Sequence, residues 1–121
     1  MIAVIFEVLP HKQHRDEYFS IAGDLRPILE TIDGFISIER FESLTEPGKV
    51  LSLSFWRDEE AVIAWRNVGE HRIAQGKGRN RIFDDYRLRV AHVVRDYGMH
   101  ERAQTPDDSR KLHGDTSSGI N

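Results

Sequence analysis

Apolar and polar residues along the first hundred positions follow patterns that predict strands and helices in turn. Residues 2–8, IAVIFEV, are almost all β-branched or aromatic and stop before Pro10, which predicts a strand that is apolar on nearly both faces. From about residue 14 to residue 32, apolar residues recur at steps of three and four, which predicts a helix with one apolar stripe. Pro27 lies inside the stripe, so the helix is expected to kink or restart there.

The next segment predicts an antiparallel hairpin. Its strands are FISIERFES, residues 35–43, and VLSLSFWR, residues 50–57, and Pro47-Gly48 between them suits the central positions of a type II turn. The second strand alternates in character. One face is expected to carry Leu51, Leu53 and Phe55, and the other Ser52, Ser54 and Trp56.

A second helix and a last strand complete the pattern. Asp58 is a suitable N-cap, and the acidic residues after it favour the positive end of a helix dipole. Gly69 is expected to break this helix, with a second helical piece from residue 70 to about residue 84. Residues 86–97, YRLRVAHVVRDY, predict the last strand, with Tyr86, Leu88, Val90 and His92 on one face.

The order of elements, β-α-β-β-α-β, predicts an α+β ferredoxin-like fold in which helices cover one face of an antiparallel sheet. The other face is expected to be too apolar to stay in contact with water, because strands one and three carry large apolar residues on both sides. A second copy of the chain is the simplest cover for it, so we expect a homodimer that closes a dimeric α+β barrel.

Composition limits the function further. The chain has 121 residues with a net charge of −3, which predicts one domain (1–99) with a polar tail (100–121) and gives no reason to expect a nucleic-acid partner. There is no cysteine, and the histidines show no metal-ligand spacing, so no metal site is expected. The apolar N-terminus is too short to span a bilayer and has no charged region before it, so we expect no membrane partner and a cytoplasmic location.

The stretch WRNVGEHRIAQGKGR, residues 65–79, holds the main candidates for chemistry. His71 is an acid/base candidate because its ordinary pKa lies near neutrality, although a histidine bonded to a carbonyl or carboxylate is the alternative. In a regular helix Gln75 follows one turn later and Arg79 two turns later, so the three could grip an oxygenated ring. They could equally bind Asp84, Asp85 or a second subunit.

The remaining candidates concern the walls of a pocket. Trp65 is expected either to stack on a flat substrate or to pack in the core. Arg72 follows His71 and either binds substrate or faces solvent or the partner subunit. His92 is expected in the core or barrel interior, and the alternative is a second polar group in the pocket. Phe6 and Phe55 are candidates for the apolar walls of the pocket.

Three segments carry a resemblance to a known family: DGFISIERFES, then LSLSFWRDEEAVIAWRNVGEHRIAQGKGR, and finally DYRLRVAHVVRDYGM. Over residues 1–99 the chain resembles the antibiotic biosynthesis monooxygenase superfamily, and within it the members with a W…EHR.AQ..GR helix. The resemblance implies oxidation of a small phenolic or hydroquinone-type aromatic by O₂ without metal, flavin or haem. The deprotonated substrate reduces O₂, and the radicals recombine to a hydroperoxide that collapses to a quinone.

Such a site needs an apolar slot, a base and a donor for the developing oxyanion, so the resemblance implies His71 as base and Arg79 or Gln75 as donor. The haem-degrading members have an asparagine on the first strand and a histidine ten residues after the helix tryptophan. Here that strand has no asparagine and the position holds Gln75, so haem degradation is not expected. The alternatives are a dimeric binding or sensing module without chemistry, and a purely structural dimer, which would have a filled core and no cavity.

Overall fold

The computed structural model describes residues 1–76 and 82–113, without the side chains of residues 70–76 and 113. A four-stranded sheet has the order β2-β3-β1-β4, and each pair of neighbours is antiparallel. Its strands are β1 (Ile2–Pro10), β2 (Phe35–Glu42), β3 (Val50–Trp56) and β4 (Phe83–His92). A 3₁₀ turn, η1 (Lys12–His14), leads into α1 (Arg15–Leu29), and α2 (Glu59–Gly76) joins β3 to β4. The predicted ferredoxin-like α+β fold is confirmed.

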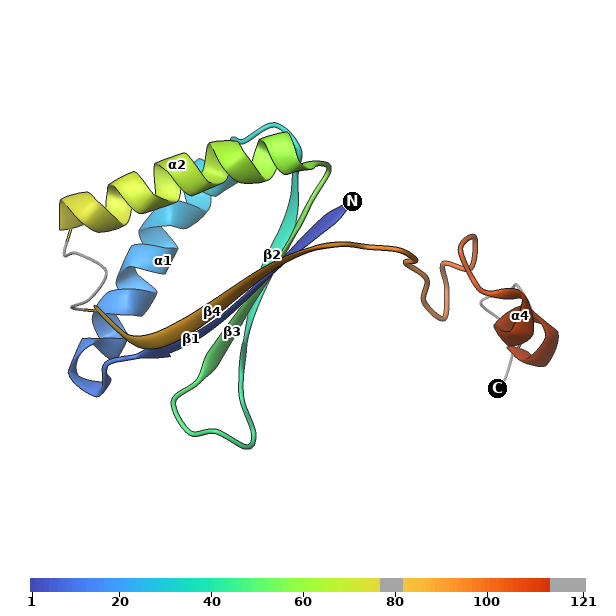
Figure 1. Ribbon diagram of the computed structural model, residues 1–121, viewed down its shortest axis with the longest axis horizontal. Helices are drawn as coiled ribbons and strands as arrows, with labels where there is room; N and C mark the ends of the chain where they lie inside the picture. The colour runs from blue at the N-terminus through green and yellow to red at the C-terminus, as the bar shows by residue number, and fades with distance from the viewer. Residues whose placement is uncertain (77–81, 114–121) are drawn as a thin grey trace.

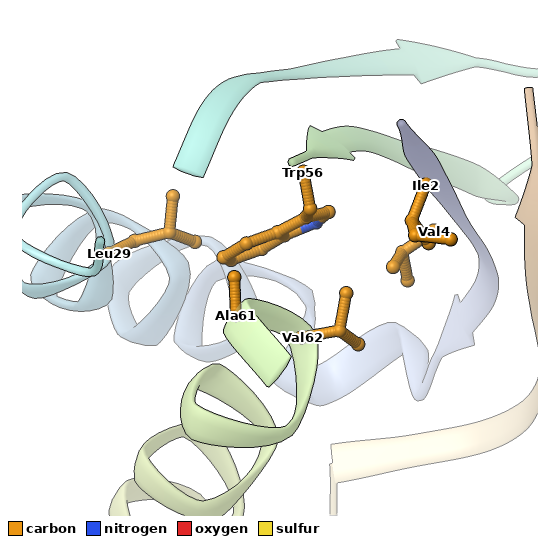
Figure 2. Close-up of a cluster of buried hydrophobic side chains, with 6 residues drawn as sticks. All are labelled: Ile2, Val4, Leu29, Trp56, Ala61 and Val62. Atoms are coloured by element: carbon orange, nitrogen blue, oxygen red, sulfur yellow. The ribbon is translucent and has the colours of Figure 1, made fainter. Parts of the chain in front are cut away.

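Both long helices lie on the same face of the sheet (Figure 1). Two buried clusters hold the layers together, one at each end of the strands. The first contains Ile2, Val4, Leu29, Trp56, Ala61 and Val62 (Figure 2). The second contains Val8, Tyr18, Val50 and Ile82. The side chains between these clusters do not fill the space between helices and sheet, and this is the origin of the cavity described below.

The local signals in the middle of the chain are confirmed. The strands β2 and β3 form an antiparallel hairpin, and Gly48 has a φ of +86°, which the second central position of a type II turn requires. The backbone N–H of Ala61 donates to Oδ1 of Asp58 at 3.0 Å, so Asp58 caps α2. These contacts fix where α2 starts relative to β3.

The predicted break at Gly69 is wrong, and α1 does not restart at Pro27. The helix α2 runs through Gly69 without interruption, and α1 continues past Pro27 to end at Leu29. A glycine inside a helix costs only about 1 kcal/mol, which packing against the sheet can offset. Pro27 lies so close to the end of α1 that the chain loses little helix beyond it.

The last strand also differs from its prediction. We expected helix up to about residue 84, but β4 begins at Phe83, which pairs with Pro10 of β1. The strand ends at His92 and not at residue 97. Ring contacts explain the early start, because Phe83 lies 5.9 Å from Phe6 and 5.8 Å from Tyr86 between ring centroids.

After β4 the chain runs away from the sheet and leads to a short helix, α4 (Asp107–His113), which lies apart from the rest of the fold (Figure 1). Arg110 orders this segment by donating to the carbonyls of Arg102, Ala103 and Thr105. No helix in the described part of the chain is both long and apolar enough to cross a bilayer. The division into a domain (1–99) and a tail (100–121) stays a prediction.

Candidate functional site

A cavity of about 330 Å³ lies between the helices and the sheet. A filled core, one of the alternatives drawn from the sequence, is therefore wrong. Because side chains alternate along a strand, the floor consists of two rows that cross the sheet. One row is Arg40, Ser52, Phe6 and Leu88, and the next is Ile38, Ser54, Val4 and Val90. The roof comes from Tyr18, Ile21, Ala22 and Leu25 of α1 and from Val62, Trp65, Arg66 and Gly69 of α2.

The floor changes in character from one edge to the other. On β1 and β4 it is apolar, whereas β2 and β3 contribute Arg40, Ser52 and Ser54. The Ser54 hydroxyl accepts a hydrogen bond from Nε1 of Trp56 at 2.9 Å, so it is partly engaged in the core. The arrangement is that of a small-molecule site, with an apolar body and a few polar groups gathered on one side.

Tyr18 and Arg40 meet at the polar side. Tyr18 is 7% exposed, and burial raises the pKa of its hydroxyl, although the charge and hydrogen bonding of Arg40 act in the opposite direction. The Nε of Arg40 is buried and has no hydrogen-bond partner. The cavity wall therefore contains a neutral hydroxyl beside a guanidinium whose donors are incompletely satisfied.

The opposite side is open. Tyr86, Leu88 and Val90 of β4 line the cavity but are 41%, 52% and 46% exposed. Apolar side chains on an edge strand thus form the mouth, and a ligand in the cavity would cover them.

Two of the predicted pocket residues lie in the cavity wall. Trp65 lines the cavity and also stacks on Trp56, with ring centroids 6.3 Å apart and an angle of 25° between the planes. Both readings of this tryptophan, pocket wall and packing, thus apply. Phe6 lies in the floor and contacts Phe83 edge to face.

Two others do not line the cavity. Phe55 pairs with Ala3 and points to the opposite face of the sheet, because it alternates with Ser54 and Trp56. His92 is on the correct face but one row beyond the cavity, opposite Ile2. Its side chain is 77% exposed, and Nε2 lies 3.8 Å from Oε1 of Glu59, so in the single chain it is not a core histidine.

The catalytic candidates cannot be placed in this cavity. The backbone of α2 includes His71, Arg72 and Gln75, but their side chains lie outside the described part of the chain, as does Arg79. Their roles stay predictions. Gly69 is the last described residue of α2 that lines the cavity. The positions on the same face of the helix one turn later are 72 and 73.

Sequence reasoning missed the polar side of the site. Tyr18 falls within the apolar stripe predicted over residues 14–32, and no role is predicted for Arg40, Ser52 or Arg66. A signal was present, because Ser52 and Ser54 share a strand face with a buried tryptophan. Among the described lining residues the charged ones are Arg40 and Arg66, and none is a carboxylate. The described residues also contain no cluster of histidines and carboxylates that could hold a metal ion.

Comparisons with known proteins agree with this fold. A family model described as antibiotic biosynthesis monooxygenase matches residues 1–77. The chain is 48% identical to jasmonate monooxygenase ABM of Pyricularia oryzae over 109 residues, which cover 88% of this chain and 51% of the relative. It is 34% identical over 62 residues to YqjZ, an uncharacterised protein of Bacillus subtilis, covering 51% of this chain and 53% of that protein.

Among solved structures, Rv0793 from Mycobacterium tuberculosis superposes with a TM-score of 0.68 at 17% identity, covering 80% of this chain and 98% of that one. This similarity concerns the fold. The chain spans about half the length of the two relatives named above.

Proposed function

The chain belongs to the antibiotic biosynthesis monooxygenase family, and we propose that it is a monooxygenase that oxidises a small ring compound with O₂. The observation that carries the proposal is the cavity of about 330 Å³, whose lining is mostly apolar and aromatic. Concave, mostly apolar spaces with a few polar groups are the usual form of sites for small organic substrates. The aromatic faces of Trp65 and Phe6 suit a flat ring.

We propose a phenol, hydroquinone or anthrone as substrate, oxidised without metal, flavin or haem. An electron-rich ring of this kind can supply the electrons that reduce O₂. With an anthrone, the methylene becomes a carbonyl, one oxygen atom of O₂ is kept and the other leaves as water. The name of the Pyricularia relative adds jasmonate as a second candidate. Hydroxylation of a C–H bond in that molecule requires two electrons from an added reductant.

In this proposal His71 is the base that deprotonates the substrate, and Gln75 or Arg79 donates to the developing oxyanion. A histidine suits this role because its ordinary pKa lies near the working pH. Gly69, two residues earlier, lies in the cavity wall, but residues two apart on a helix lie on different faces, so its position does not direct His71 to the cavity. The assignment is therefore tested separately from the activity.

The test is oxygen uptake after anaerobic mixing and aeration, with anthrones, hydroquinones and reductant-supplemented jasmonate. We expect uptake with product formation in the wild type, without added metal or flavin, and its loss in His71→Ala. His100→Ala, in the exposed tail, is the control. Equal rates in all three proteins would remove His71 from the mechanism and leave the activity standing. Uptake no faster than the spontaneous reaction with every compound would refute the monooxygenase proposal.

One observation favours a second candidate, a binding or sensing module without chemistry. The described lining of the cavity contains no histidine and no carboxylate, so no described residue there is an obvious base near neutral pH. Tight binding of a ring compound without oxygen uptake would decide for this candidate.

We also propose that two chains associate through the uncovered face of the sheet. That face carries Ile5, Leu51, Leu53 and Phe55, with the Glu7–Arg89 ion pair of 2.8 Å among them. Light scattering after gel filtration should give twice 14.0 kDa for the wild type. Leu53→Glu should give a monomer, and Leu44→Glu, in a fully exposed loop position, should leave the dimer intact. A wild type of 14.0 kDa would refute the dimer.

A further inference from the structure

We propose that the cavity binds the ionised carboxylate of an otherwise apolar ring compound and that Arg40 is the residue that binds it. This inference rests on the proposed function in one respect: it takes the same cavity as the substrate site. It adds the chemical class of the ligand and the end of the cavity at which its charge lies.

The position of Arg40 is the first support. It follows Ile38 on the inner face of β2, and its neighbour across the strands is Ser52 of β3, so its side chain belongs to the cavity floor. No described carboxylate lies within ion-pair distance of it, and its Nε is buried without a hydrogen-bond partner. By contrast, Arg15 pairs with Glu42 at 2.7 Å, Arg26 with Glu30 at 3.3 Å and Arg89 with Glu7 at 2.8 Å.

Arg40 as a whole is half-buried, but burying its Nε without a hydrogen-bond partner is costly, because the desolvation of that donor is not offset. The chain as a whole has a net charge of −3, yet the described lining of its cavity carries Arg40 and Arg66 and no acid. An anionic ligand would supply the missing charge. A guanidinium binds a carboxylate through two parallel N–H···O bonds, which fixes the orientation of the ligand as well as its charge.

The neighbours of Arg40 suit a carboxylate. The raised pKa of Tyr18 keeps its hydroxyl protonated at neutral pH, so it does not act as the counterion and can donate to an acceptor. The Ser52 hydroxyl is adjacent on the floor and can also donate. Two hydroxyl donors and a guanidinium at one end match the several lone pairs of a carboxylate.

The rest of the floor sets the size and polarity of the ligand. From Arg40 the row crosses Ser52 and Phe6 to Leu88, which is three interstrand spacings, or about 14 Å. Beyond Ser52 this row is apolar up to the mouth at β4. A bicyclic or substituted monocyclic acid fits this span, with its carboxylate at Arg40 and its ring between Phe6 and Trp65.

The test compares 1-naphthaleneacetate with its neutral amide, 1-naphthaleneacetamide, by calorimetric titration of the full chain. The two probes have the same apolar body and differ in charge. Since hydrogen bonds to charged groups are worth about 1.5–3 kcal/mol, we expect the wild type to bind the acid roughly 10- to 100-fold more tightly than the amide. Arg40→Met should abolish this preference by weakening binding of the acid alone, and Arg40→Lys should restore part of it.

Two control variants separate Arg40 from charge in general. Arg26→Met removes an exposed arginine of α1 that pairs with Glu30 outside the cavity, and Arg66→Met removes the exposed arginine at the cavity rim. Arg26→Met should keep the preference for the acid unchanged, and Arg66→Met should reduce it less than Arg40→Met does. If Arg66→Met abolishes it and Arg40→Met does not, the assignment to Arg40 is overturned.

Three results with the wild type alone would also overturn the proposal, even if Arg40→Met failed to fold. They are equal affinity for acid and amide, no binding of either, and tighter binding of 2-naphthol than of the acid. Oxygen uptake with the anthrones, hydroquinones and reductant-supplemented jasmonate of the first test distinguishes the two proposals. An Arg40-dependent preference for the acid without oxidation of any compound supports the carboxylate site and refutes the monooxygenase. Oxidation without that preference supports the monooxygenase and refutes the carboxylate site.

Discussion

Adding a single methyl group at each of three glycines tests the helices and the turn that support the cavity. Gly23 lies inside α1 and Gly69 inside α2, whereas Gly34 lies in the turn before β2 with a φ of +92°. Among the described residues, a Cβ at Gly23 would meet nothing within 4 Å, and one at Gly69 would meet the Trp65 ring at 3.7 Å. At Gly34 it would lie 2.8 Å from the Cβ of Ala61.

The expected magnitudes follow from these geometries. Alanine is about 1 kcal/mol more favourable than glycine inside a helix, so Gly23→Ala and Gly69→Ala should each raise the melting temperature by roughly 3–6 °C. Gly34→Ala should lower stability by about 1–3 kcal/mol from its backbone conformation alone. The close contact with Ala61 adds to this loss, because the first turn of α2 is held by the Asp58 cap and has little room to move.

Thermal and urea unfolding followed by circular dichroism measure all three variants under the same conditions. The informative comparison is between Gly69→Ala and Gly34→Ala, which introduce the same group with opposite expected signs. If Gly69→Ala destabilises as much as Gly34→Ala, then α2 is not a regular helix at residue 69 and the roof of the cavity is wrongly placed. Gly23→Ala shows whether the gain at a helical glycine is realised in this protein at all.

Three further predictions concern the core and the surface charges. Leu29→Ala should lower the free energy of unfolding, measured in urea, by about 2–4 kcal/mol, because Leu29 is 2% exposed. The control Leu44→Ala, at a fully exposed position, should change it by no more than about 0.5 kcal/mol. Trp56→Phe should cost about 2–3 kcal/mol, since it removes part of a fully buried ring and the N–H that donates to a buried serine, and a loss below about 0.5 kcal/mol would contradict this packing. Hydrogen bonding from Arg57 lowers the pKa of Asp33, so the folded chain binds fewer protons in acid than the unfolded chain and this stability is lost as the pH falls below about 4. Arg57→Met should therefore make the free energy of unfolding less dependent on pH in that range, and an unchanged acid dependence would argue against the ion pair.

The fold was predictable because its signals are local. Alternation along residues 50–56 gave the two faces of β3, and Asp58 marked the start of α2. The errors arose where distant contacts decide. The segment around Phe83 has acidic residues that suit a helix, but ring contacts with Phe6 and Tyr86 and pairing with β1 make it a strand. A single sequence does not contain these partners in readable form.

The site was predictable only in part for a related reason. Trp65 and Phe6 were identified as wall residues from their type, but Phe55 is also aromatic and lies on the other face. Residue type does not tell which strands are neighbours. The polar side of the cavity depends on the pairing of Arg40 with Ser52, and this register appears only when β2 and β3 are aligned.

The register of β3 is the feature on which the site depends most. A shift by one residue would exchange its two faces, placing leucines in the cavity and both serines outside it. Hydrophobic burial discriminates poorly between these registers, because both faces of β3 carry large apolar residues. Polar contacts discriminate better. Arg15 of α1 holds the hairpin in this alignment by donating to the Gly48 carbonyl at 3.0 Å and to Glu42 at 2.7 Å. These contacts between Arg15 and the hairpin therefore help to fix the strand alignment that brings Arg40 to the cavity.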